Sequence, residues 1–152
     1  MEDLEKFNPS EMISESLRGS TVICLDHYAE DSWQLTFGPG RADLNISCPW
    51  RLVSGGAVVL GGSDHGQKFG LPQQVDVGAK TTRVLSGKPV LDGRIDEATA
   101  DLCINFGDVR LDVFNDSSGY EGWTFADQHG LMLVAQGGGQ IAICKPLRTK
   151  AT

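Results

Sequence analysis

The stretch WQLTFGPGRADLNIS, residues 33–47, decides the fold. Apolar side chains occupy every second position from Trp33 to Phe37, which is the period of a β-strand with one buried face. The tripeptide GPG marks a turn, and the alternation resumes at Leu44 and Ile46. The stretch therefore predicts a β-hairpin.

The second half of the chain follows the same order. WQLTFG aligns with LCINFG, DLNIS aligns with RLDVF, and WRLVSGGAVVLGG aligns with WTFADQHGLMLVAQGGG, so that Trp50 falls on Trp123. Each strand in such a unit buries one face, and two packed copies share a core. The pattern predicts an internal duplication of a four-strand β unit.

Two helices accompany the strands. NPSEMISESLRG predicts an N-terminal helix with Ser10 as N-cap and Gly19 at its end. VDVGAKTTRVLSG predicts a short central helix with Asp76 as N-cap and Gly87 just past its end, and Pro89 prevents continuation. The expected fold is α+β, mostly antiparallel β-sheet built from two pseudo-repeated β units.

The 152 residues predict a single domain. Its expected parts are an N-terminal helical segment (1–19), a first β repeat (20–64), a loop with a short helix (65–87), a second β repeat (88–144) and a tail (145–152).

Charge and hydropathy narrow the class of protein. The formal net charge is −7, and the acidic residues gather in 1–31 and 92–127. Such a chain repels nucleic acid and attracts a basic partner, although a solvated acidic surface explains the charge equally. No apolar run approaches the roughly 20 residues of a membrane span, and the acidic N-terminus lacks a signal sequence. A cytoplasmic location is expected.

Cysteine and glycine patterns predict no metal or cofactor. Cys24, Cys48, Cys103 and Cys144 lie far apart without zinc spacing, and buried free thiols are expected. The glycine clusters are followed by strands or loops rather than by a helix N-terminus, so they indicate turns and bulges rather than phosphate sites.

The sequence offers little support for catalysis. His27, His65 and His129 each have a carboxylate within two residues, a pairing that suits acid–base chemistry. Adjacent strand residues point to opposite faces, however, and carboxylates are common in loops anyway. Nucleophile motifs such as GxSxG and HExxH are absent. We expect no enzyme; a small enzyme or ligand-binding domain that uses the His65 and His129 loops is the alternative.

The segment GYEGW, residues 119–123, combines Tyr120 and Glu121 ahead of a strand that starts at Trp123. Tyrosine and acids on a loop are typical of a protein-binding patch. They are equally typical of an ordinary loop held by a tyrosine hydroxyl, and both interpretations stay open.

The segments LSGKPV, DLCINFGDVRLDV, YEGW and LMLVAQGGGQIAI together resemble a small bacterial protein family of unknown function. Proteins of this size and composition are similar to immunity proteins of polymorphic-toxin and contact-dependent inhibition systems. The resemblance implies a non-enzymatic protein that neutralises a cognate toxin.

The expected toxin is a basic nuclease domain, and an acidic surface would occlude its active site. The candidate contact residues are Asp112, Asp116, Tyr120 and Glu121, with Asp96 and Glu97 as second choices. Alternation places Asp112 opposite Leu111 and Val113, which predicts exposure. A self-associating β protein, including a homodimer, is the other alternative.

Overall fold

The computed structural model describes residues 8–145. The helices in this range are α1 (Pro9–Leu17) and α2 (Val77–Leu85), and two short 3-10 turns are η2 (Gly62–Asp64) and η3 (Gly137–Gly139). The strands are β1 (Thr21–Ala29), β2 (Ser32–Gly38), β3 (Ala42–Ile46), β4 (Trp50–Ser54), β5 (Ala57–Gly61), β6 (Asp92–Ile95), β7 (Leu102–Asn105), β8 (Val109–Val113), β9 (Trp123–Asp127), β10 (Met132–Ala135) and β11 (Ile141–Cys144).

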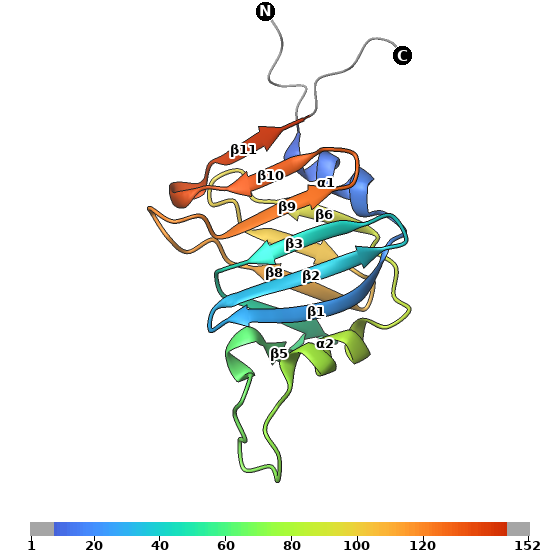
Figure 1. Cartoon of the computed structure of the whole chain (residues 1–152), viewed down its shortest axis with the longest axis vertical. Coiled ribbons are helices and arrows are strands. Elements are labelled where there is room, and N and C mark those ends of the chain that lie inside the picture. Colours follow the sequence, from blue (N-terminus) through green and yellow to red (C-terminus); the bar gives the residue numbers. More distant parts are fainter. Residues whose placement is uncertain (1–7, 146–152) are drawn as a thin grey trace, which may run out of the picture.

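The strands form two antiparallel sheets (Figure 1). Sheet A has six strands in the order β1-β2-β3-β9-β10-β11, and sheet B has five in the order β5-β4-β8-β7-β6. The core lies between them and contains alternate residues of both sheets, such as Leu35, Leu44, Leu111 and Phe125. The predicted α+β fold with antiparallel sheets and two helices is confirmed.

Each half of the chain contributes to both sheets. After β1–β3 in sheet A the chain crosses to sheet B for β4 and β5, and after β6–β8 in sheet B it crosses to sheet A for β9 and β10. The registers correspond: Ile46 pairs with Trp123 where β3 meets β9, and Val113 pairs with Trp50 where β8 meets β4. Trp50 and Trp123 therefore hold corresponding places. Descent of the two halves from a duplication stays a prediction.

Helix α1 covers the open edge of sheet B. The Ser14 hydroxyl donates to the Gly93 carbonyl and accepts from the Gly93 N–H, both at 2.9 Å. One turn earlier, Ser10 bridges the N–H and carbonyl of Ile95 in the same way. These hydroxyls satisfy backbone groups that β6 would otherwise expose along its edge. On the opposite side of the sandwich, α2 packs against β1.

The helix boundaries match the sequence prediction except at one cap. The N-cap of α2 is Asp76, whose carboxylate accepts from Ala79 N, as predicted. The N-cap of α1 is Asn8 rather than Ser10, because the Asn8 side chain reaches Glu11 N and frees Ser10 to bond the edge of β6. The helix therefore starts one residue before the predicted cap.

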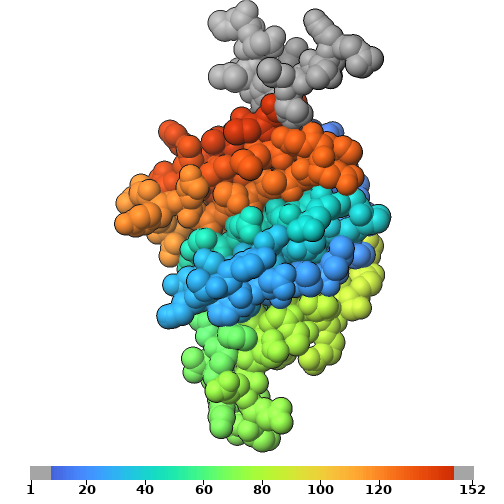
Figure 2. Space-filling view, in the orientation of Figure 1, coloured from blue at the N-terminus to red at the C-terminus, as the bar shows by residue number. Residues whose placement is uncertain are grey.

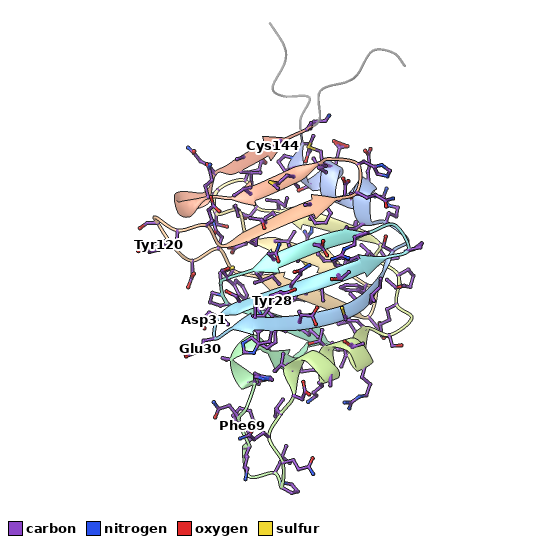
Figure 3. All side chains as sticks on the ribbon, viewed as in Figure 1. Tyr28, Glu30, Asp31, Phe69, Tyr120 and Cys144 are labelled. Carbon is purple, nitrogen blue, oxygen red and sulfur yellow. The ribbon has the colours of Figure 1, made fainter. Side chains whose placement is uncertain are left out.

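Figure 2 shows the outer face of sheet A, which neither helix covers. From its lower end projects the segment 65–76, held at its base by Gly66 N to Val75 O and Val75 N to Gln67 O. Phe69, which lies part-way along this segment, is 67% exposed (Figure 3). The segment displays an aromatic side chain to solvent.

The four cysteines are free, as expected, but only Cys48 is buried. Cys144 is exposed because it lies on β11, the last strand of sheet A. No helix within residues 8–145 has the length and apolar character of a membrane span. The expected segment 1–19 and tail 145–152 lie partly outside the described residues.

Candidate functional site

Both crossings between the sheets lie at the same end of the sandwich. The chain crosses at 47–49 and again at 114–122, and Ser47 N donates to Gly122 O at 2.8 Å where the crossings meet. The turns 30–31 and 96–101 reach the same end. We call these four segments the crossover end; Figure 3 shows Glu30, Asp31 and Tyr120 on this side of the molecule.

A cavity of about 360 Å³ opens at the crossover end and is called here the tryptophan cavity. Its lining residues are Glu30, Asp31, Trp33, Ser47, Cys48, Pro49, Trp50, Gly62, Ser63 and Asp116. Three of these carry carboxylates and none is Lys or Arg. Glu30, Asp31 and Asp116, called the acidic rim, are all exposed. The cavity therefore combines aromatic walls with a negative entrance.

An aromatic cluster stands behind the cavity. Trp33 stacks on His27 with ring centroids 4.1 Å apart, and it meets Trp50 edge to face at 5.7 Å. His65 contacts both Trp33, at 5.5 Å, and His27, at 4.9 Å. Aromatic pairs in such stacked and edge-on arrangements stabilise a fold by about 0.5–1.5 kcal/mol beyond the burial of their surface. The cluster fixes the two indole rings that form the cavity wall.

The histidines of this cluster are used by the fold. His65 Nδ1 accepts a hydrogen bond from Val77 N, the first residue of α2, at 3.2 Å. His27 Nε2 lies 3.2 Å from the Glu30 carbonyl oxygen. Each ring thus has one nitrogen engaged with backbone. Both rings serve to join neighbouring segments.

Trp50 lacks a hydrogen-bond partner for its indole N–H within the described residues. The residue is 5% exposed, and its Nε1 edge lies directly against Gly62. A Cβ at Gly62 would stand 2.5 Å from Nε1, so only glycine allows this approach. A buried donor without an acceptor is costly, by about 1–3 kcal/mol, and calls for a physical explanation.

Cys48 is the one thiol that lines the tryptophan cavity. Burial, together with the nearby negative charges of Asp116 and Asp101, raises the pKa of the Cys48 thiol to about 12. The nucleophilic form of cysteine is the thiolate. Near neutral pH this side chain is a protonated, apolar part of the cavity wall and a poor nucleophile.

The loop 114–122 is held by small polar side chains. Asn115 Nδ2 donates to the carbonyls of Thr99 and Gln136, both at 3.0 Å, and Asn115 N donates to Asp101 Oδ1 at 2.8 Å. Ser117 Oγ accepts from the N–H of Tyr120. Tyr120 itself is 81% exposed. Asn115 and Ser117, rather than a tyrosine hydroxyl, order this loop and leave the ring of Tyr120 on the surface.

The structure brings most of the sequence-predicted contact residues to the crossover end. Asp116, Tyr120 and Glu121 lie on the crossing 114–122, and all three are exposed. Asp96 and Glu97 lie on the turn 96–101. Asp96 Oδ1 accepts from the N–H groups of Thr99 and Ala98, and these backbone hydrogen bonds lower the pKa of Asp96. Asp96 is therefore a turn-forming residue as well as a surface acid.

The predicted exposure of Asp112 is wrong. Alternation does place it on the outer face of sheet B, but Asp112 is only 9% exposed. Arg51 Nε lies 3.1 Å from Asp112 Oδ2, and Arg110 Nε lies 3.0 Å from Asp112 Oδ1. The hydrogen bond and charge of Asp112 raise the pKa of Arg110. Arginine stems cover the carboxylate, an effect that strand period cannot reveal.

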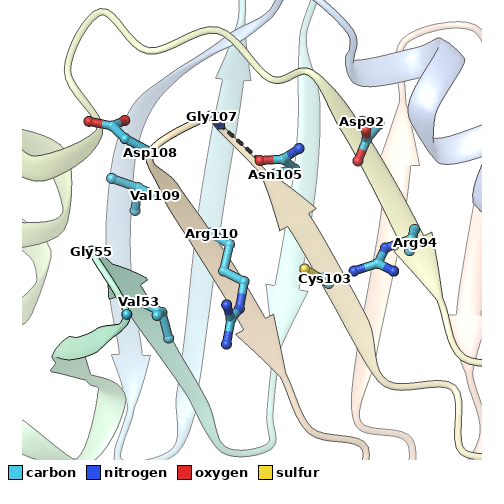
Figure 4. A pocket seen from close by; sticks show the side chains of 11 residues that line it. Val53, Gly55, Asp92, Arg94, Cys103, Asn105, Gly107, Asp108, Val109 and Arg110 are labelled. Atoms are coloured by element: carbon cyan, nitrogen blue, oxygen red, sulfur yellow. Dashed lines mark hydrogen bonds between the residues drawn. The ribbon is translucent and has the colours of Figure 1, made fainter.

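A second hollow, of about 520 Å³, lies on this outer face of sheet B (Figure 4). Arg94 and Arg110 line it together with Asp92, Asn105 and Cys103. Burial raises the pKa of the Cys103 thiol, although Arg94 opposes the shift. Its positive and negative side chains are mixed, so this hollow offers no single charge to a ligand.

His65 and His129 do not form a joint site. His129 lines a separate cavity with Ser16, Arg41 and Asp127, beside the turn from β9 to β10. Among residues 8–145, no three His, Cys, Asp or Glu side chains are placed to hold a metal ion.

No protein-family model, curated protein or solved structure matches this chain. The resemblance to a bacterial family and to immunity proteins therefore stays a prediction. Assignment of the site rests on its own geometry.

Sequence reasoning overlooked the tryptophan cavity. Trp33 and Trp50 were expected only as strand residues, and Glu30 and Asp31 only as part of the acidic N-terminal region. One signal was available. The predicted hairpin sets Trp33 opposite Ile46, and only residues 47–49 separate Ile46 from Trp50, so both rings meet where the chain changes sheet.

Proposed function

We propose that this chain is a non-enzymatic binding protein that recognises a basic protein partner through its crossover end. The observation that carries the proposal is the tryptophan cavity, with two indole walls, three rim carboxylates and no Lys or Arg among its described lining residues. Aromatic side chains in a desolvated pocket surrounded by polar groups are typical of interaction hot spots. The acidic rim attracts a basic partner and accelerates association.

Exposed aromatic groups extend this surface. Tyr120, at 81% exposure, lies on the same side of the molecule as Glu30 and Asp31, and Phe69, at 67%, lies on the segment that projects below them (Figure 3). Phe69 is held at φ 47°, a conformation that is uncommon for residues other than glycine. Backbone strain of this kind gathers at binding segments. Both side chains support recognition of a folded protein.

Binding accounts for the crossover end better than catalysis does. The Cys48 thiol is protonated near neutral pH, and the rings of His27 and His65 are engaged with backbone and with Trp33. A nucleophile and a base within hydrogen-bond reach of each other, the usual requirement of covalent catalysis, do not occur in this cluster. These contacts support a binding role.

Self-association is less favoured. Pairing between chains needs free strand edges, and α1 covers the edge of β6 through Ser10 and Ser14. Helix α2 packs on β1, the terminal strand of sheet A. Two of the four terminal strands are thus protected.

The narrower form of the proposal is toxin neutralisation: the partner is a basic toxin domain whose active site the acidic surface occludes. Co-expression with the product of the neighbouring upstream gene tests it. We expect that product to arrest growth when expressed by itself, and this chain to restore growth and to co-purify with it.

Charge reversal at two exposed glutamates, one on the acidic rim and one away from it, tests whether the crossover end is the surface that binds the partner. Glu30 and Glu15 are both exposed glutamates, but Glu30 lies on the acidic rim and Glu15 lies on α1. We expect Glu30→Lys to weaken the complex about 10-fold or more, with a strong dependence on salt, and Glu15→Lys to leave it unchanged. A harmless neighbouring product that does not co-purify would contradict the toxin proposal.

A further inference from the structure

The two corresponding tryptophans differ in one respect. Trp123 Nε1 donates to the Ala100 carbonyl oxygen at 2.8 Å, whereas Trp50 Nε1 lacks an acceptor within the described residues. Both side chains are buried, at 1% and 5% exposure, and both pair with the last residue of a neighbouring strand, Ile46 or Val113. The two tryptophans hold equivalent positions in the sheets, and they differ in whether a hydrogen-bond acceptor lies beside the indole N–H.

The length of one turn explains the difference. The turn between β6 and β7 spans 96–101, and Ala100 within it is fully buried, with φ 65°, so that its carbonyl reaches Trp123. The corresponding turn between β1 and β2 contains only Glu30 and Asp31. A two-residue turn is too short to bring a carbonyl to Trp50. Gly62 covers Nε1 of Trp50 in place of a carbonyl, and the tryptophan cavity opens beside the two residues.

We propose that an arginine-containing segment of the partner occupies this space. A main-chain carbonyl of the segment accepts the hydrogen bond from Trp50 Nε1, as the Ala100 carbonyl does from Trp123. The guanidinium pairs with the acidic rim. This inference rests on the proposed function and specifies which chemistry the cavity recognises.

Two features favour arginine over other residues. The rim offers three carboxylates around one entrance, and a guanidinium has five planar donors, whereas an ammonium has three. Guanidinium is also more weakly hydrated than ammonium, which suits a cavity walled by indole rings.

The carbonyl reaches Trp50 through a small displacement of η2. Gly62, its first residue, covers Nε1, and Asp64 Oδ2 holds the turn by accepting from Gly61 N at 2.9 Å. The turn is short and its His65 N to Gly62 O bond is long, at 3.4 Å. This is the part of the cavity wall that moves when the segment binds.

Nuclear magnetic resonance of the full chain, labelled with ¹⁵N, tests the inference through the indole N–H signals of its three tryptophans. Trp50→Phe and Trp123→Phe assign the signals. The probe is the blocked peptide acetyl-Gly-Arg-Gly-amide, and the citrulline peptide of the same shape but without charge is its control. We expect the arginine peptide to move the Trp50 indole signal downfield, while the Trp123 signal stays in place as an internal reference.

The citrulline peptide should bind about 10-fold or more weakly, because charge-assisted hydrogen bonds to the acidic rim are lost. Asp116→Asn should weaken the arginine peptide similarly, and Glu15→Gln should have no effect. A Trp50 signal that does not move at saturating peptide concentration, or equal binding of arginine and citrulline, overturns the inference.

The two proposals fail in different ways. If the co-expressed partner binds but leaves the Trp50 signal unmoved, the cavity assignment is overturned and the binding function stands. If the arginine peptide binds in the cavity but co-expression yields no complex, the cavity assignment stands and the proposed partner is overturned.

Discussion

Replacement of Trp50 or Trp123 by phenylalanine measures how much each indole N–H contributes to the free energy of unfolding. Trp123→Phe removes the donor to the Ala100 carbonyl and leaves a buried acceptor unsatisfied, while Trp50→Phe removes a donor that has no partner in the described residues. Both variants lose part of a buried ring, a shared cost of about 1–2 kcal/mol. The unsatisfied carbonyl adds about 1–3 kcal/mol to Trp123→Phe only.

We therefore expect the free energy of unfolding to fall by about 2–5 kcal/mol in Trp123→Phe. In Trp50→Phe it should fall by at most about 1–2 kcal/mol, because removal of the unpartnered donor offsets part of the loss of buried ring. Urea unfolding followed by far-ultraviolet circular dichroism measures both, and a difference of 2 kcal/mol separates the midpoints by about 1 M. This probe does not depend on tryptophan emission, which the variants alter. Equal losses, or a larger loss in Trp50→Phe, would refute the reasoning.

Three further predictions concern the edge of sheet B, the cavity thiol and the covered carboxylate. Ser14→Ala should lower the free energy of unfolding by about 1–3 kcal/mol and speed amide exchange at Gly93, because both backbone groups of Gly93 lose their partner; unchanged exchange would contradict the edge-covering role. At pH 8, iodoacetamide should modify the exposed Cys144 at least about 100-fold faster than Cys48, whose pKa of about 12 leaves little thiolate. The rate at Cys48 should rise as the pH approaches that pKa. Comparable rates for the two cysteines, measured by peptide mass spectrometry, would contradict the protonated state of Cys48. Asp112→Ala should cost about 1–2 kcal/mol in urea unfolding, less at high salt, since two half-exposed guanidiniums lose their shared partner; full retention of stability would show that the pairing is not stabilising.

Local patterns predicted the elements well because each depends on neighbours in sequence. Alternation from Trp33 to Phe37 became β2, and the N-cap Asp76 became the start of α2. The error at Ser10 has a tertiary cause: its hydroxyl serves β6, which lies 85 positions away along the chain at Ile95. Propensity describes a residue in isolation, and the partner strand decides which polar group it satisfies.

The site was harder to predict because it depends on the lengths of connections. Loop composition indicated Asp116 and Tyr120 correctly as surface residues, and both lie at the crossover end. Trp50 and Trp123 align as aromatic residues at the starts of corresponding strands, and the sequence therefore predicts the same structural role for both. What distinguishes them is the two-residue turn at Glu30 and Asp31, and its effect appears only when the sheets are assembled.

The crossing of each half into both sheets has a consequence for a nicked chain. Protease cleavage in the exposed segment 65–76 would separate the two halves covalently, yet β3 would still pair with β9 and β4 with β8. Neither fragment retains a complete sheet by itself. Two separately expressed fragments, divided near Phe69, should therefore associate and fold together. This makes the chain a candidate split reporter, whose signal depends on each fragment supplying strands that complete the sheets of the other.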